Sequence, residues 1–319
     1  MSLYLVTGGA GFIGSNIVDA LVKKGQGVRV IDNFSSGKRE NLAAVLEKIE
    51  LLEGDIRDFS FLKKAAKGVD YILHQAALRS VPKSIDDPAS FNEVNVGGTL
   101  NLLLAARESK VKRLVFASSS SVYGNSPSFP EKETQIPLPI SPYAASKLAG
   151  EHYCRVFSQV YGLETVSLRY FNVFGARQSL ENQYAVVVPK FIISMLNNEA
   201  PPIHGSGRQS RDFTYIDNVV EANILAAASP GVSGEVFNIA CGRDYSILEL
   251  AQFLNKIMGK KIKPEFNPSR QGDVPRTLAD ISKAGKLLKL EIKVNFEEGL
   301  KKTVEWFQEH QSEYANSSI

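Results

Sequence analysis

Two side chains four residues apart, Tyr143 and Lys147, are the first candidates for chemistry in this sequence. They lie in the helical pattern of Ser141–Tyr161, so their spacing places both on one face of a helix. A lysine ammonium close to a phenol lowers the pKa of the phenol, which lets tyrosine act as a base near neutral pH. The serines at 118–121 end a predicted strand earlier in the chain, and one of their hydroxyls can hydrogen-bond the same substrate oxygen.

A glycine-rich turn near the N-terminus carries a second kind of chemistry. Glycines 8, 11 and 14 follow the predicted strand Leu3–Thr7 and open a helix. Gly8 permits the tight turn, Gly11 lets the backbone approach a pyrophosphate, and Gly14 allows the helix to pack close to the strand. Asp32 ends the second strand 18 positions after Gly14, where a carboxylate accepts hydrogen bonds from a ribose. Because this carboxylate repels a 2′-phosphate, the sequence predicts NAD rather than NADP.

Further residues of the predicted NAD site follow the glycines or end the neighbouring strands. The loops after the third and fourth strands are expected to flank adenine and pyrophosphate. These candidates are Phe12, Ile13, Asn33, Asp55, Ile56, Ala76 and Ala77.

The elements that must position these residues alternate between short apolar strands and amphipathic helices, which is typical of βαβ units and a parallel sheet. We therefore predict an α/β fold, a Rossmann-type doubly wound parallel sheet with a smaller C-terminal α/β substrate-binding lobe. Residues 1–175 are expected to form the NAD-binding domain, to which parts of 211–245 return, and residues 176–319 mainly the substrate lobe. The predicted strands are Leu3–Thr7, Val28–Asp32, Ile49–Leu52, Tyr71–His74, Leu114–Ala117 and Thr165–Arg169, and later helices are Ile247–Met258 and Phe296–His310.

Composition excludes several classes of function. The chain has 319 residues, 44% of them hydrophobic, and a net charge of +3 from 37 basic and 34 acidic side chains, which argues against binding to nucleic acid or a membrane surface. No apolar run reaches the roughly 18 residues of a membrane span, and we expect a cytoplasmic protein. Cys154 and Cys241 have no metal-binding spacing, so free thiols and no metal are predicted.

Taken together, these motifs resemble the extended short-chain dehydrogenase/reductases that act on nucleotide sugars. The resemblance runs from Thr7 to Lys283 and includes Ser141-Pro142-Tyr143-x-x-x-Lys147 and the run from Arg169 to Gly175. It implies that Ser119 is the catalytic hydroxyl and Tyr143 the base. It also implies that Lys147 lowers the pKa of Tyr143 and holds the nicotinamide ribose, so that both residues contact NAD.

The residues after Ser119 separate reaction types within that family. Sugar-nucleotide 4,6-dehydratases carry an Asp-Glu pair where this chain has Ser120 and Ser121, so we do not expect dehydration. UDP-glucuronate 4-epimerases place threonine at the position of Asn172 and arginine at that of Ser179, which argues against a uronate substrate. UDP-glucuronate decarboxylases share the asparagine and stay an alternative.

The resemblance also implies where UDP is held. Asn172, Arg211, Arg270 and Asp273 match positions at which the epimerases bind UDP. Arginine forks suit a diphosphate, and an aspartate can accept hydrogen bonds from ribose hydroxyls.

The sugar end of the predicted site is less uniform. Thr277 matches a position opposite the 2-substituent of the sugar, where a small residue leaves room for an N-acetyl group. Arg79 stands where relatives have glycine or lysine, and its charge can reach the phosphates or alter the sugar preference. The other predicted substrate contacts are Ser120, Ser121 and Val188.

The sequence therefore predicts an NAD-dependent 4-epimerase of UDP-hexoses that works through a transient 4-keto sugar. The preferred substrate is UDP-N-acetylglucosamine, converted to UDP-N-acetylgalactosamine, with UDP-glucose and UDP-galactose also accepted. An epimerase restricted to plain hexoses, or a UDP-glucuronate decarboxylase or epimerase, is the alternative. A homodimer is expected, because paired helices on the dinucleotide domain commonly form dimers in this family.

Overall fold

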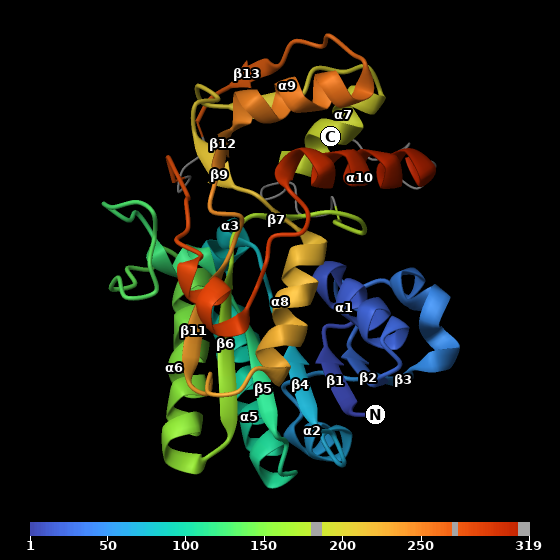
Figure 1. Cartoon of the computed structure of the whole chain (residues 1–319), viewed down its shortest axis with the longest axis vertical. Coiled ribbons are helices and arrows are strands. Elements are labelled where there is room, and N and C mark those ends of the chain that lie inside the picture. Colours follow the sequence, from blue (N-terminus) through green and yellow to red (C-terminus); the bar gives the residue numbers. More distant parts are fainter. Residues whose placement is uncertain (180–186, 270–273, 312–319) are drawn as a thin grey trace.

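A parallel β-sheet forms the centre of the molecule (Figure 1). The structure is a computed structural model that describes residues 1–179, 187–269 and 274–311. Within these residues, seven parallel strands follow the order β11-β6-β5-β4-β1-β2-β3. The predicted α/β fold is confirmed, and the six predicted strands agree with it within two residues. The strands are β1 (Leu3–Thr7), β2 (Gly27–Asp32), β3 (Glu50–Glu53), β4 (Tyr71–His74), β5 (Arg113–Ser119), β6 (Glu164–Tyr170) and β11 (Glu235–Ile239).

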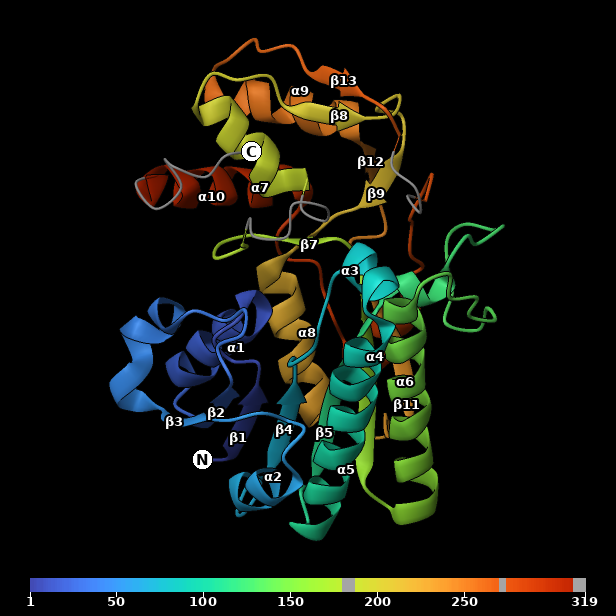
Figure 2. The same ribbon diagram turned by 180° about the vertical axis from the view of Figure 1, so that it is seen from behind.

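Helices cover both faces of the sheet, as its apolar inner strands require. One face packs against α1 (Phe12–Lys23), the 3₁₀ helix η1 (Arg39–Lys48) and α8 (Ile216–Ala228). The other face packs against α2 (Phe59–Ala65), the π-helical turn η2 (Asn92–Gly98), α5 (Thr99–Glu108) and α6 (Pro142–Tyr161). Figure 2 shows α5 and α6 side by side on this second face. Short helical turns connect the elements: α3 (Val81–Asp86), α4 (Pro88–Phe91), η3 (Ser120–Tyr123) and η4 (Ala284–Leu288).

The strand order reverses beside β1, and this reversal opens a crevice at the carboxyl ends of the strands. Thr7, the last residue of β1, lies between Ile31 of β2 and His74 of β4. The loops that follow β1 and β4 therefore leave the sheet as neighbours. Ligand-binding loops in open α/β sheets lie at this kind of place.

A smaller lobe lies over the carboxyl edge of the sheet (Figure 1). Stacked and edge-to-face contacts of Phe174, Phe213, Tyr245 and Phe296 join strands of the lobe to its last helix. The elements of the lobe are α7 (Val187–Leu196), α9 (Ile247–Met258) and α10 (Phe296–Glu309), with the strand pairs β7 (Val173–Phe174) and β10 (Thr214–Tyr215), β8 (Pro202–His204) and β13 (Glu265–Asn267), and β9 (Ser210–Asp212) and β12 (Asp244–Ser246).

No described helix has the length and apolar character of a membrane span.

A buried ion pair joins α6 to the sheet. The guanidinium of Arg169 on β6 donates to both carboxylate oxygens of Glu151 on α6, at 2.9 and 2.7 Å, and both side chains are 4% exposed. Ser118 on β5 donates its hydroxyl hydrogen to the same carboxylate. The aromatic ring of Tyr123 packs against the guanidinium, with its centroid 4.7 Å from the central carbon. These contacts fix α6 against the ends of β5 and β6.

The substitution Arg169→Met should lower the free energy of unfolding by roughly 3–5 kcal/mol, because it leaves the Glu151 carboxylate buried without its cation. Urea denaturation of the purified protein measures this change. The matched control is Lys256→Met, which removes the exposed partner of Glu297 and should cost less than about 1 kcal/mol. Equal losses in the two variants would contradict the importance of the buried pair.

Candidate active site

A cavity of about 1260 Å³ lies at the carboxyl ends of the strands and reaches residues of the small lobe. Pockets for a single small ligand commonly occupy about 300–1,000 Å³, so this cavity has room for two ligands. Every predicted cofactor residue lines it: Gly8, Gly11, Phe12, Ile13, Gly14, Asp32, Asn33, Asp55, Ile56, Ala76, Ala77, Tyr143 and Lys147.

The glycine turn after β1 provides a cradle for an anion. Gly8 has a φ of +66°, and a Cβ there would lie 2.7 Å from the backbone nitrogen of Ala76. A Cβ on Gly14 would lie 2.1 Å from the carbonyl oxygen of Gly8. Helix α1 begins after Gly11, and no side chain caps its first N–H groups. These uncapped amides and the helix dipole suit a pyrophosphate, so the turn fits a dinucleotide.

Asp32 lies at the end of β2 with its carboxylate in the cavity wall. Its oxygens accept hydrogen bonds from the backbone N–H groups of Ala10, at 2.9 Å, and Phe34, at 2.8 Å. Burial raises the pKa of Asp32, and these N–H groups lower it. Next to it, the amide of Asn33 donates a hydrogen bond to the carboxylate of Asp55. Hydrogen bonds from Arg57 lower the pKa of Asp55 to about 2.

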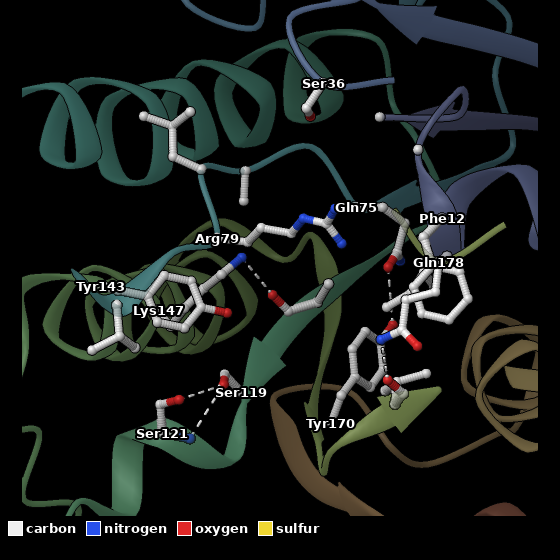
Figure 3. A pocket seen from close by; sticks show the side chains of 18 of the residues that line it. Phe12, Ser36, Gln75, Arg79, Ser119, Ser121, Tyr143, Lys147, Tyr170 and Gln178 are labelled. Carbon is white, nitrogen blue, oxygen red and sulfur yellow. Dashed lines mark hydrogen bonds between the residues drawn. The ribbon is translucent and has the colours of Figure 1, made fainter. Parts of the chain in front are cut away.

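The predicted catalytic side chains meet at one end of the cavity. Ser141 caps α6 by accepting a hydrogen bond from the N–H of Ala144, so the helix begins at Pro142 and Tyr143 lies in its first turn. Figure 3 shows Tyr143 and Lys147 next to each other on α6 and Ser119 at the end of β5. The Ser119 hydroxyl donates to the Ser121 hydroxyl at 3.0 Å. The sequence therefore identified residues that the fold brings together.

Two cationic side chains, Arg79 and Lys147, lie in the same cavity as Tyr143. Burial raises the pKa of Tyr143, while a hydrogen bond with Ser119 and the charge of Arg79 lower it. The Lys147 ammonium donates to the carbonyl of Ala117 at 2.9 Å and lies 6.0 Å from the centroid of the tyrosine ring. Burial lowers the pKa of Lys147 itself to about 8. The lowering of the Tyr143 pKa by Lys147 stays a prediction, and Ser119 and Arg79 are two further groups that lower it.

Most of the predicted substrate residues also line the cavity. Thr277 differs, because it is 8% exposed and is absent from the described lining residues. Its hydroxyl accepts hydrogen bonds from the amide of Asn172, at 2.8 Å, and the N–H of Asp212, at 3.2 Å. Arg270 and Asp273 lie outside the described residues. The predicted substrate residues that line the cavity are Arg79, Ser120, Ser121, Asn172, Val188 and Arg211.

Asp212 organises the backbone at this substrate end. Its carboxylate accepts the N–H groups of Cys241, Gly242 and Ala279 at 2.9–3.2 Å, and Arg211 next to it lines the cavity. Burial raises the pKa of Asp212 to about 7, although these N–H groups lower it. Glu131 lies close by, 2% exposed, and burial together with the charge of Asp212 raises its pKa to about 8.

Several cavity residues were not identified from the sequence. Gln75 follows β4 directly, and Tyr170 lies in the motif that begins at Arg169, so the position of each in the sequence could have indicated a place in the site. Nothing in the sequence around Gln178 or Lys190 indicated that these residues line the cavity. Both cysteines are free as predicted, and no group of three metal-binding side chains occurs in the described part of the chain.

Comparison with known proteins agrees with this geometry. Residues 4–240 match the model of the NAD dependent epimerase/dehydratase family. The chain belongs to this family. The chain is 37% identical over 308 residues to a putative UDP-glucose 4-epimerase of Methanocaldococcus jannaschii, covering 96% of this chain and 98% of the relative. It is 36% identical to the UDP-glucuronate 4-epimerase of Thermodesulfobacterium geofontis, covering 97% of each chain.

A solved structure extends this likeness to three dimensions. The UDP-N-acetylglucosamine 4-epimerase of Methanobrevibacter ruminantium M1, in complex with UDP-N-acetylmuramic acid, is 43% identical, with a TM-score of 0.93. The likeness covers 97% of this chain and 99% of that one. The predicted family, the cofactor NAD and the prediction of an NAD-dependent 4-epimerase are confirmed.

The raised pKa of Glu131 makes stability depend on pH. A carboxyl group whose pKa rises from 4.5 to about 8 on folding stabilises the protein fully below the lower value, and this contribution is lost as the pH rises towards 8. Urea denaturation across this range should show stability falling with pH. In the Glu131→Gln variant, the decrease in the free energy of unfolding over this pH range should be smaller by roughly 2–4 kcal/mol. An unchanged pH dependence in the variant would contradict the assignment.

Proposed function

We propose that this UDP-sugar 4-epimerase interconverts UDP-N-acetylglucosamine and UDP-N-acetylgalactosamine and also accepts UDP-glucose. The observation that carries the proposal is the grouping of Tyr143, Ser119 and Lys147 at one end of a cavity whose wall also includes the cofactor cradle and Arg211. Ser120 and Ser121 bring hydroxyls rather than carboxyls next to Ser119, which favours epimerisation over dehydration.

The mechanism follows from these side chains. Tyr143 accepts the proton of the C4 hydroxyl, and Ser119 donates a hydrogen bond to the same oxygen. NAD held at the turn of Gly8, Gly11 and Gly14 would supply a reversible hydride acceptor for C4 of the sugar. Asn172 and Arg211, with Arg270 and Asp273, hold UDP, so the sugar itself is free to turn. Tyr143 gives its proton back to the oxygen at the end of the cycle, and no net redox change results.

The proposed N-acetyl preference rests on Thr277, which the resemblance places opposite the 2-substituent. Thr277 lies behind Asn172, to which its hydroxyl is hydrogen-bonded, and not among the described residues that line the cavity. A tyrosine at this position would fill space that an N-acetyl group needs. The 43% identical relative from M. ruminantium, a UDP-N-acetylglucosamine 4-epimerase, supports the same substrate.

A uronate substrate is the second candidate. It is favoured by Arg79, which lines the cavity and acts electrostatically on Tyr143, so a sugar carboxylate could meet its charge. The 36% identical UDP-glucuronate 4-epimerase and a 34% identical UDP-N-acetyl-α-D-glucosaminuronate decarboxylase agree with this candidate. Ser179, which stands at the position of the uronate epimerases' arginine, argues against it.

Purified protein should convert UDP-N-acetylglucosamine to UDP-N-acetylgalactosamine without added NAD, because the cofactor is regenerated in each turnover and stays bound. A proton NMR time course that follows the anomeric signals measures the conversion. UDP-glucose and UDP-glucuronate are tested in parallel. Conversion of UDP-glucose alone would overturn the N-acetyl proposal, and a pentose product from UDP-glucuronate would indicate a decarboxylase.

The substitution Tyr143→Phe should lower kcat by about 10²–10⁴-fold, the usual contribution of a general acid–base group. Its fold should be unchanged, since only the hydroxyl is lost. Tyr161→Phe on the same helix is the control, because that side chain is 48% exposed at the far end of α6. A Tyr143→Phe enzyme with normal kcat would exclude this tyrosine as the base.

We also propose a homodimer through α5 and α6. Tyr153, Val156 and Val160 form an exposed apolar stripe on α6, with spacings of three and four residues. The double substitution of Val156 and Val160 by aspartate should produce monomers, because charges on both residues oppose burial of the stripe. Sedimentation velocity measures the mass, and a dimer that survives would exclude this surface. The cytoplasmic location and the domain boundaries stay predictions.

A further inference from the structure

Three polar side chains from distant parts of the chain form a closed ring of hydrogen bonds behind the cavity. The amide nitrogen of Asn223, on α8, donates to the hydroxyl of Tyr170 at 2.8 Å. That hydroxyl has two acceptors within reach, the amide oxygen of Gln75 at 3.2 Å and that of Asn223 at 3.0 Å, and the Gln75 nitrogen donates to the Asn223 oxygen at 3.0 Å. When the hydroxyl points to Gln75, each side chain donates once and accepts once within the ring, which makes its hydrogen bonds mutually reinforcing.

The orientation of the Asn223 amide is determined by its helix. Its nitrogen also donates to the carbonyl oxygen of Val219 at 2.8 Å, so nitrogen and oxygen cannot exchange places without losing hydrogen bonds. Asn223 is completely buried. An asparagine in a buried helix interior is less favourable than leucine unless its polar atoms are satisfied. The ring satisfies them and gives this residue a use beyond packing.

Two members of the ring line the cavity, and the third does not. Gln75 and Tyr170 belong to the cavity wall, and Asn223 lies behind them. Figure 3 shows both wall residues across the cavity from Tyr143 and Lys147. Phe12 of the pyrophosphate cradle lies next to Gln75 in the same view. The ring therefore faces the part of the cavity between the pyrophosphate cradle and the catalytic residues, where the nicotinamide half of NAD belongs.

The ring also fixes the loop after β4. The N–H of Gln75 donates to the carbonyl of Thr7 at 3.1 Å, and Ala76 follows directly. A Cβ on Gly8 would lie 2.7 Å from the Ala76 nitrogen, so this loop and the glycine turn are in close contact. A shift of Gln75 would disturb both.

We propose that Asn223 is a positioning residue for the cofactor, holding Gln75 and Tyr170 as a fixed wall beside the nicotinamide half of NAD. Through this wall it keeps NAD bound while the sugar turns. A looser wall would let NAD dissociate more easily and would let reduced cofactor accumulate when the 4-keto sugar escapes before hydride returns. The proposal rests on NAD as resident cofactor and not on which UDP-sugar is the substrate.

Asn223→Leu and Tyr170→Phe both break the ring with little change in volume. Asn218→Leu is the matched control, because Asn218 lies on the same helix, is 2% exposed and binds the backbone of Lys293 and Val294 away from the cavity. The NAD content of each purified holoenzyme is followed during dialysis, and thermal unfolding reports stability. Absorbance of reduced nicotinamide is recorded during turnover with UDP-N-acetylglucosamine and with UDP-glucose.

The two ring variants should lose NAD about tenfold faster than the wild type, the effect expected for one buried hydrogen bond. The double variant should lose it little faster than either single variant, because one ring is broken in all three. Asn218→Leu should lose stability but retain NAD. Equal NAD retention in Asn223→Leu, Tyr170→Phe and Asn218→Leu would overturn the proposal, whichever sugar is the substrate. If Asn223→Leu does not fold, the comparison of NAD loss between Tyr170→Phe and Asn218→Leu tests the proposal in the same way.

Discussion

The buried pair between Arg169 and Glu151 is the interaction on which the rest of the site depends. Glu151 is two helical turns beyond Tyr143 on α6, and Arg169 is three residues before Asn172. The carboxylate of Glu151 also accepts from Ser118, the neighbour of Ser119. One carboxylate thus connects the helix that carries the proposed base, Tyr143, to the strands that lead to the proposed catalytic hydroxyl, Ser119, and the proposed substrate contact, Asn172.

The two ends of the cavity have different physical requirements. The proposed cofactor end is closely packed, because the glycine turn leaves no space for side chains and the ring around Asn223 joins three elements. The wall at the proposed sugar end consists of the small side chains of Ser119–Ser121 and Asn172 and the long side chain of Arg79. Tight retention of a cofactor and rotation of a sugar require this difference. Binding energy at UDP is compatible with both, since it does not depend on which face the sugar presents.

The sequence predicted the sheet, and it picked out candidate catalytic residues that the fold places together, because these signals are local. The strands are apolar runs, the glycine motif has a required spacing, and Tyr143 and Lys147 share a helix face by spacing alone. The partners of those residues are not local. Gln75 and Asn223 are 148 positions apart, and Asn172 and Thr277 are 105 apart, so only the folded chain shows these contacts. The effect of Arg79 on Tyr143 likewise depends on how the loop after β4 returns to α6.

The central proposal is that one hydride leaves C4 of the sugar and returns to the same carbon within this cavity. It is tested most directly with UDP-N-acetylglucosamine that carries deuterium at C4, incubated with the holoenzyme in ordinary water. Mass spectrometry and NMR of the product then locate the label. The account predicts UDP-N-acetylgalactosamine with deuterium retained at C4, because the hydride does not exchange with solvent. A product that has lost deuterium to water would contradict a hydride mechanism at this site.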